Sequence, residues 1–114
     1  MKTIKVKDIK LSNNSPIIVI AGLNVLEDKS MAIDVARELK EITYNNSVPF
    51  IFKASFDKAN RSSIESYRGP GIKNSIQIFE AIKKELDIPI ITDIHEQGQI
   101  LSLIHISEPT RQDR

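Results

Sequence analysis

Residues 53–71 hold the densest group of side chains able to bind anions in this chain. Four cations stand among hydroxyl and amide groups: Lys53, Lys58, Arg61, Arg68, Ser55, Asn60, Ser62 and Ser63. This composition disfavours a helix or a core strand, because charges resist burial and short polar side chains compete for backbone hydrogen bonds. It favours a loop that holds phosphate or carboxylate groups, and a solvated surface loop is the alternative.

Arginine is concentrated in the same stretch. Residues 1–100 contain eleven lysines but three arginines, and Arg61 and Arg68 are two of the three. A guanidinium group offers a planar pair of donors that matches phosphate and carboxylate, which an ammonium group does not. The choice of arginine therefore favours oxyanion binding.

Polar side chains also follow three apolar runs that have the character of strands. Along residues 50–55, Ile51, Lys53 and Ser55 share one face, and the apolar Phe50, Phe52 and Ala54 share the other. Asn24 follows the run 17–21, and Asp93 ends the run 90–93. The carboxyl ends of parallel strands meet at one edge, so we expect the following residues to converge there: Asn24, Lys53, Ser55, Lys58, Arg61 and Asp93.

Three segments resemble one enzyme family in the same order and at similar spacing. They are GLNVLED at 22–28, KASFDKANRSS at 53–63 with SYRGPG at 66–71, and ITDIHE at 91–96. Together they resemble 3-deoxy-D-manno-octulosonate 8-phosphate synthases, over about residues 3–96. The central motif is long, and it is much more specific than a lone glycine fingerprint.

The resemblance implies substrates and residue roles. The substrates would be phosphoenolpyruvate and arabinose 5-phosphate, condensed with water into an eight-carbon sugar acid phosphate with release of phosphate. Lys53 and Lys58 match lysines near both substrates, and Asp93 matches an acid near the sugar hydroxyls. Asn60, Arg61 and Ser62 match contacts to the sugar and its phosphate. Asn24, Lys53, Lys58 and Asp93 are the implied catalytic residues, and Lys53, Ser55, Lys58, Asn60, Arg61 and Ser62 the implied substrate-binding residues.

Alternating strands and helices must position these side chains. Alternation at 4–6 and 9–11 predicts a small hairpin, and strands are predicted at 17–21, 50–55 and 90–93. Helical spacing predicts helices over about 32–43 and 72–86. The order indicates an α/β protein with parallel strands, either doubly wound or barrel-like. The resemblance implies the N-terminal part of a (β/α)₈ barrel, with about three units and no closure, because a barrel takes roughly 250 residues.

Composition excludes several classes of protein. A net charge of +1 and 5% aromatic residues argue against a nucleic-acid binder. No apolar run approaches the roughly 20 residues of a membrane span. Lysines followed by the apolar run 17–20 resemble the start of a signal peptide. However, Asp8 and the polar turn 13–16 interrupt this pattern, and no small-residue cleavage site follows. The absence of cysteine fits a cytoplasmic protein.

The segment Asp93-Ile-His95-Glu96 has two interpretations. A metal site is the weaker one, and a chance pair of His and Asp with no metal is the other. Within the family that the chain resembles, some members hold a divalent ion through a cysteine at the position of Asn24, and members with asparagine there need none. An amide oxygen is a poor transition-metal ligand compared with a thiolate. We therefore expect no metal and no other cofactor. The turn Arg68–Gly71 serves either binding or simple turn geometry.

The end of the chain differs from the rest. From Leu101 to Arg114 there is no lysine, and two of the five arginines lie there. LSLIHISEPTR resembles the translation of a sequencing adapter, and it does not resemble the continuation of the family. The expected division is residues 1–96 as the N-terminal portion of a synthase barrel and 97–114 as a foreign tail, which would leave the chain inactive by itself. A divergent natural fourth strand is the alternative.

Two other functions remain open from the sequence. One is a related enzyme that condenses phosphoenolpyruvate with a sugar phosphate, of the heptulosonate 7-phosphate synthase type. The other is a non-catalytic module that binds anions. By resemblance, the complete synthase would be a homotetramer in which Arg61 and Ser62 reach the sugar phosphate of a neighbouring subunit.

Overall fold

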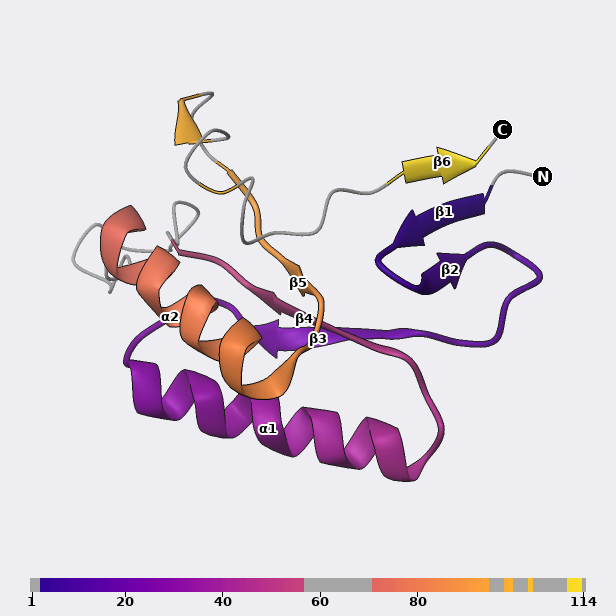
Figure 1. Ribbon diagram of the computed structural model, residues 1–114, viewed down its shortest axis with the longest axis horizontal. Coiled ribbons are helices and arrows are strands. Elements are labelled where there is room, and N and C mark those ends of the chain that lie inside the picture. Colours follow the sequence, from indigo (N-terminus) through magenta and orange to yellow (C-terminus); the bar gives the residue numbers. More distant parts are fainter. Residues whose placement is uncertain (1–2, 57–70, 95–97, 100–102, 104–110, 114) are drawn as a thin grey trace.

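The computed structural model describes residues 3–56, 71–94, 98–99, 103 and 111–113 (Figure 1). The elements follow in the order β1 (Thr3–Val6), β2 (Ile9–Leu11), β3 (Val19–Leu23), α1 (Lys29–Asn45), β4 (Phe50–Ala54), α2 (Ile72–Leu86), β5 (Ile90–Ile91) and β6 (Arg111–Asp113). The described strands form two open, three-stranded sheets, β2-β1-β6 and β3-β4-β5. The chain is therefore a mixed α/β structure.

The sheet β3-β4-β5 is parallel, as the alternation of strands and helices predicted. Its strands lie side by side in chain order, with α1 and α2 as the two connections. The predicted strand at 17–21 begins later, at Val19, because the ladder starts where Val19 N–H donates to Pro49 O at 3.0 Å. The predicted strand at 90–93 is shorter, and only Ile90–Ile91 pairs with β4.

The predicted hairpin is confirmed, and it belongs to a separate antiparallel sheet. Ile4 pairs with Leu11, and Val6 pairs with Ile9. Lys7 in the turn has φ 55°, the left-handed conformation that tight hairpin turns require. On its other edge β1 pairs with β6, the last strand of the chain (Figure 1). The sequence did not predict β6.

Helix α1 is closed at both ends by side chains. The Asp28 carboxylate accepts a hydrogen bond from Met31 N–H at 2.7 Å, which satisfies a free donor of the first turn. At the other end, the Asn46 side-chain amide donates to Ile42 O at 2.7 Å. The helix ends in the turn at Asn45-Asn46-Ser47, where Ser47 has φ 56°.

Helix α2 occupies the range that its periodicity predicted, Ile72–Leu86. It follows Gly71, whose φ of 87° suits glycine, and it ends at Asp87 in the left-handed conformation. Lys83 and Lys84 lie in its last turn, where cations interact favourably with the negative end of the helix dipole.

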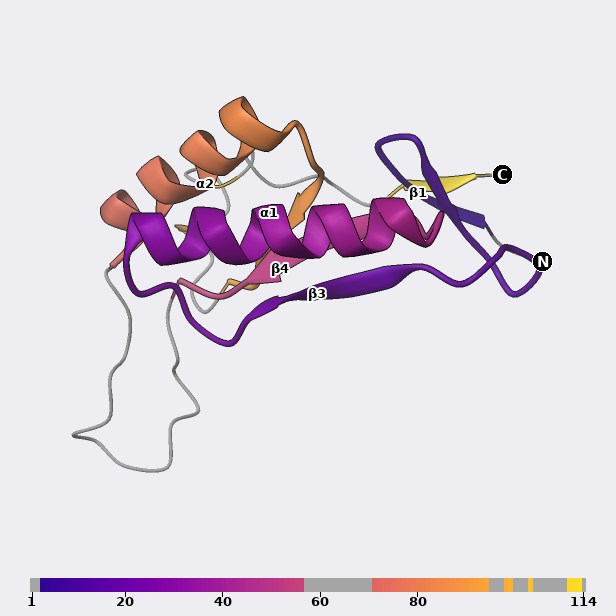
Figure 2. The ribbon, with the colours of Figure 1, turned by 90° about the horizontal axis from the view of Figure 1, so that it is seen from below.

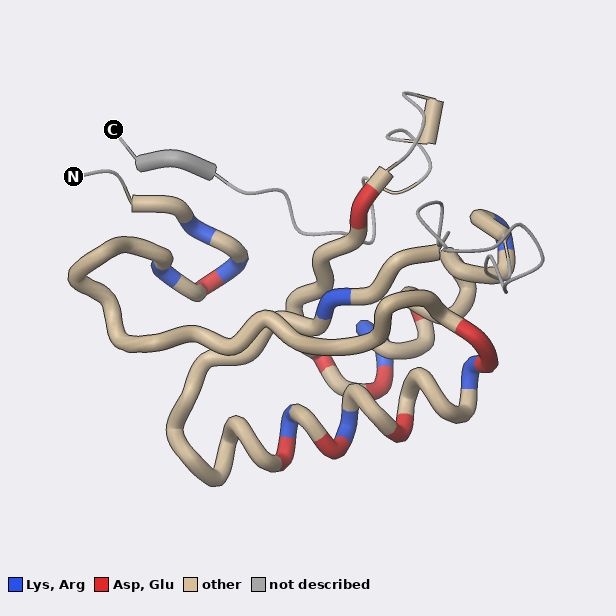
Figure 3. The backbone as a smooth tube through the Cα atoms, turned by 180° about the vertical axis from the view of Figure 1, so that it is seen from behind, with Lys and Arg blue, Asp and Glu red and all other residues tan. Residues whose placement is uncertain are grey.

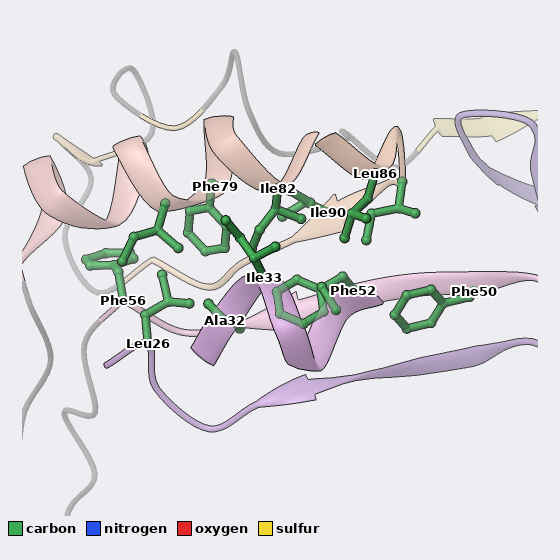
Figure 4. Close-up of a cluster of buried hydrophobic side chains, with 14 of the residues drawn as sticks. Leu26, Ala32, Ile33, Phe50, Phe52, Phe56, Phe79, Ile82, Leu86 and Ile90 are labelled. Carbon is green, nitrogen blue, oxygen red and sulfur yellow. The ribbon is translucent and has the colours of Figure 1, made fainter. Parts of the chain in front are cut away.

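One apolar core joins the parallel sheet to the helices. Phe50, Phe52 and Ala54 project from one face of β4, and they pack against buried residues of both helices, such as Ile33 and Phe79 (Figure 4). The three apolar residues that were predicted to share one face of the strand thus pack together on the helices. Figure 2 shows α1 and α2 on the same side of the strands. The other face of the sheet carries the alternate side chains of each strand, and neither α1 nor α2 covers it (Figure 2).

Ion pairs and hydrogen bonds tie the helices together near the amino-terminal end of the parallel strands. Arg37 of α1 donates to Glu85 of α2 at 3.0 Å, and the Lys40 ammonium donates to the carbonyl of Leu86. The hairpin joins this group through Lys7, which pairs with Asp87 at 3.1 Å. Among the described residues, no helix is both long and apolar enough to cross a membrane.

Candidate active site

The register of the parallel sheet brings three chain segments into one row. Gly22 of β3 pairs with Lys53 of β4, and Lys53 pairs with Ile91 of β5. Residues paired in register point to the same face of a sheet. Lys53 therefore projects from the face opposite Phe52 and the helices, at the carboxyl-terminal part of the strands.

The next row along the strands carries the predicted polar residues. Asn24 comes directly after Leu23, which pairs with Ala54, so it lies at the level of Ser55. On the other side of β4, Asp93 follows Ile91 by two residues and reaches the same level. The sequence predicted that Asn24, Ser55 and Asp93 converge at one edge, and the strand register agrees. Figure 3 shows the acidic and basic positions along the backbone, with red and blue segments spread over α1 and few of them on the parallel strands.

An irregular hydrogen bond holds the segment of Asn24 against β4. Leu26 N–H donates to Ser55 O at 2.8 Å. A regular continuation of the β3–β4 register would use Val25 for this bond, so one extra residue is accommodated between Leu23 and Leu26. Such an insertion at the end of the ladder resembles a β-bulge, and bulges redirect side chains next to active sites. Leu26 is fully buried in the core and anchors the far end of the insertion.

The exposure of the four described candidates differs. Lys53 and Asn24 are exposed, Asp93 is half-buried, and Ser55 is buried with 4% of its surface exposed. The Lys53 side chain makes no hydrogen bond or ion pair with the described part of the chain. An exposed ammonium group, an amide, a hydroxyl and a carboxyl group at one strand edge can bind an anion and orient a hydroxyl or a water.

The other predicted site residues lie outside the described residues. These are Lys58, Asn60, Arg61 and Ser62, which follow β4 in the chain. Arg68, His95 and Glu96 are likewise outside them. Their place in the site is still a prediction, as is the role of every residue named above.

Sequence reasoning missed one residue of this edge, Gly22. A Cβ atom on Gly22 would lie 1.8 Å from the carbonyl oxygen of Lys53 and 2.8 Å from its carbonyl carbon. Only a glycine allows β3 to run this close to β4. The signal that could have found it is a glycine inside a strand pattern, which often marks a bulge or a close approach of two backbones.

The metal interpretation gains no observation from the fold. Within the described ranges, no three His, Asp or Glu side chains lie close enough together to hold an ion. His95 and Glu96, which that interpretation needs, are outside those ranges.

Comparison with known proteins gives a consistent picture. The sequence model described as the DAHP synthetase I family matches residues 1–106. Three curated relatives carry the name 2-dehydro-3-deoxyphosphooctonate aldolase. That of Pseudoalteromonas translucida is 54% identical over 96 residues, which is 84% of this chain and 34% of the relative.

The other two relatives agree. The protein of Pseudomonas savastanoi pv. phaseolicola is 49% identical over 98 residues, 86% of this chain and 35% of its own length. That of Ectopseudomonas mendocina is 44% identical over 107 residues, 94% of this chain and 38% of its own length. The chain thus spans about a third of the length of the curated relatives that it matches.

Proposed function

The chain belongs to the DAHP synthetase I family, and from this membership we propose that the complete gene product is a 3-deoxy-D-manno-octulosonate 8-phosphate synthase. It condenses phosphoenolpyruvate with D-arabinose 5-phosphate and water, and it releases phosphate. The names of the curated relatives support this choice within the family. The observation that carries it is the row of Asn24, Ser55 and Asp93 beside the exposed Lys53 at the carboxyl edge of the parallel sheet.

The reaction begins with bond formation between the two substrates. C3 of phosphoenolpyruvate attacks the aldehyde carbon C1 of arabinose 5-phosphate, and the aldehyde oxygen takes up a proton. Water adds at C2 of the former phosphoenolpyruvate, and the C2–O bond to the phosphoryl group breaks. Phosphate leaves, and C2 becomes the ketone of the eight-carbon product.

Fixed positive charge is what this chain contributes to that chemistry. Both substrates are anions, and their repulsion must be offset before C3 and C1 can meet. We assign Lys53 and Lys58 to the carboxylate and phosphate groups, where an ammonium group can also polarise the aldehyde oxygen. Asp93 orients sugar hydroxyls or the attacking water, and Asn24 holds the reacting end of a substrate.

The segment after β4 binds the sugar phosphate in this proposal. Asn60, Arg61 and Ser62 bind arabinose 5-phosphate, and Ser55 is a further substrate-binding residue. In the proposed homotetramer, Arg61 and Ser62 act on the substrate of a neighbouring subunit. The proposed partners are the small-molecule substrates and the other subunits of the homotetramer. We propose no nucleic-acid or membrane partner. The proposed location is the cytoplasm.

A (β/α)₈ barrel is the proposed architecture of the complete protein. The resemblance to the synthase family carries this choice, because three such strands fit a barrel and one half of a doubly wound sheet equally well. The strands lie in chain order β3-β4-β5. Both connecting helices lie on one side of the strands (Figure 2), as in the outer ring of a barrel. The hairpin β1-β2 would cover the amino-terminal end of the barrel.

Residues 1–96 form the proposed synthase portion, and 97–114 the proposed foreign tail. The expected outcome for the purified 114-residue chain is no formation of the eight-carbon product, since five of eight units and their phosphate ligands would be missing. An independent reading of the gene across codons 90–114 tests the proposed junction. Product formation by the 114-residue chain would refute this division of the sequence.

Metal independence is a separate expectation, and it follows from asparagine at position 24. Activity of the complete gene product should survive dialysis against EDTA within about twofold. Loss of activity with EDTA and recovery with zinc or manganese would contradict it. An Asn24→Cys variant is the matched comparison, because a thiolate there supplies the softer ligand.

The decisive experiment is a substrate comparison. The complete gene product is incubated with phosphoenolpyruvate and either arabinose 5-phosphate or erythrose 4-phosphate, and products are identified by mass spectrometry. We expect the eight-carbon product. Preference for erythrose 4-phosphate would assign the heptulosonate 7-phosphate synthase activity that the name of the family suggests. Phosphate-ester binding with no turnover would leave an anion-binding module.

A further inference from the structure

We propose that Gly22 is a positioning residue of the active site, which acts by fixing Asn24 relative to Lys53. The proposal rests on the proposed function, because it concerns the placement of two residues assigned to that reaction. It goes beyond that function because Gly22 offers no chemical group of its own.

The space around Gly22 is the first observation. In the β3–β4 ladder Gly22 lies directly opposite Lys53. A Cβ at position 22 would meet three backbone atoms of that one residue, Lys53 O at 1.8 Å, C at 2.8 Å and N at 3.1 Å. A flexible side chain can move away from such a contact, but backbone held in a sheet cannot. Any other residue at position 22 therefore has to move β3 relative to β4.

The strand pairing determines which side chains are displaced when β3 moves relative to β4. Lys53 lies on β4 and Ser55 directly follows it, and the pairing of Lys53 with Ile91 ties both to the segment of Asp93. Gly22 is no part of that pairing, so these three residues keep their mutual arrangement. Asn24 alone is attached through β3. A shift at position 22 therefore displaces Asn24 from the other three.

The bulge makes this displacement hard to absorb. Asn24 lies between the last ladder pair, Leu23 with Ala54, and the bond from Leu26 N–H to Ser55 O at 2.8 Å. Leu26 itself is fully buried. Only two residues, Asn24 and Val25, thus join two fixed points, so the segment has little freedom to return the Asn24 side chain to its place.

The glycines of the described residues offer a contrast. A Cβ at Gly71 or Gly98 would meet nothing within 4 Å. Gly71 is explained by its φ of 87°, and Gly98 stands in open space. Gly22 alone of these three is required by the approach of a neighbouring backbone, and it stands at the row of Lys53.

The test is a double-mutant cycle in the complete gene product. Gly22→Ala should lower kcat about 100-fold, the effect of displacing a group by about 1 Å. In an Asn24→Ala background, the same change should lower kcat by less than about threefold, because the side chain that it displaces is gone. Ile82→Val in the core serves as the control for a loss of stability, and it should lower the melting temperature with kcat retained.

Each outcome decides the proposal. Equal effects of Gly22→Ala in both backgrounds would refute action through Asn24, and a loss of kcat matched by Ile82→Val would make the effect one of stability. If the wild-type protein forms no product, the proposed function fails, and hydrogen exchange then tests the positioning. Gly22→Ala should speed exchange of the Leu26 amide at least tenfold, and unchanged exchange would refute the proposal.

Discussion

The two ends of the parallel strands are built from different kinds of contact. At the amino-terminal end, charged side chains have partners: Lys7 with Asp87, Arg37 with Glu85, and Lys40 with Leu86 O. At the carboxyl-terminal end, Lys53 is exposed and has no partner within the described part of the chain, and the strand geometry is irregular. Cations at one end hold the structure together, and the cation at the other end is the one that we propose to bind substrate.

This division predicts that charge removal has opposite effects at the two ends. The loss of a cation at the carboxyl edge should lower activity and leave stability unchanged. The loss of one at the amino-terminal end should do the reverse. The matched pair is Lys53 and Lys40, since both lie on elements of the same core.

The largest expected effect is that of Lys53→Met in the complete gene product. kcat should fall about 100- to 1,000-fold, the range for removing one preorganised donor from an anionic transition state. The melting temperature should stay within about 1 °C, because no described contact is lost. Steady-state kinetics and calorimetry measure the two quantities.

Lys40→Met is its control. Losing the hydrogen bond to Leu86 O should cost about 1 kcal/mol of stability, or about 2–4 °C in melting temperature, with kcat retained. If Lys40→Met lowered kcat as much as Lys53→Met, the division between the two ends would be wrong.

An intermediate effect is expected of Arg61→Ala. Losing a charge-assisted contact to the sugar phosphate should cost about 2–3 kcal/mol, which raises KM for arabinose 5-phosphate about 30- to 150-fold. KM for phosphoenolpyruvate should change by less than about threefold. Equal increases for both substrates would argue against the assignment of Arg61 to the sugar phosphate.

The smallest effect concerns pH and the ion pair of Lys7 with Asp87. The hydrogen bond and charge of Lys7 lower the pKa of Asp87 below its usual value of 3.8. A lowered pKa means that the ionised form contributes stability above the unfolded pKa, and that this contribution is lost as pH falls through the folded pKa. Because the pair is exposed, the contribution is small.

Asp87→Asn tests the ion pair, since asparagine also tolerates the left-handed conformation of this position. The melting temperature of the variant should lie slightly below that of the wild type at pH 7 and coincide with it near pH 2. A difference that persists undiminished at pH 2 would show that the carboxylate charge is not its source.

The sequence predicted the parts of the fold that depend on local pattern. Helix α2 was expected at 72–86 and lies there, because Phe79, Ile82 and Leu86 recur at helical spacing and are all buried. The short ladder of β5 and the late start of β3 escaped prediction, since pairing depends on the partner strand as well as on the apolar run. The pairing of β6 with β1 joins opposite ends of the chain, and no local pattern encodes it.

The candidate site was predicted as a set of polar residues at one edge, and the register agrees for Asn24, Ser55 and Asp93. Composition revealed these residues because polar side chains stand out after apolar strands. It did not reveal Gly22 or the bulge at Leu26. Both depend on how closely two backbones approach, which residue types alone do not specify.

The pairing of β1 with β6 has a consequence for the order in which the chain folds. Residues 3–5 and 111–113 meet across almost the whole chain (Figure 1), and closing a loop of that length costs roughly 4 kcal/mol of entropy. The pairings within the β3-β4-β5 unit close much shorter loops. Helix formation in each connection further reduces the length of flexible chain that must be closed. We therefore expect the parallel unit to form first, and the two termini to pair only after the hairpin and the core have brought them close.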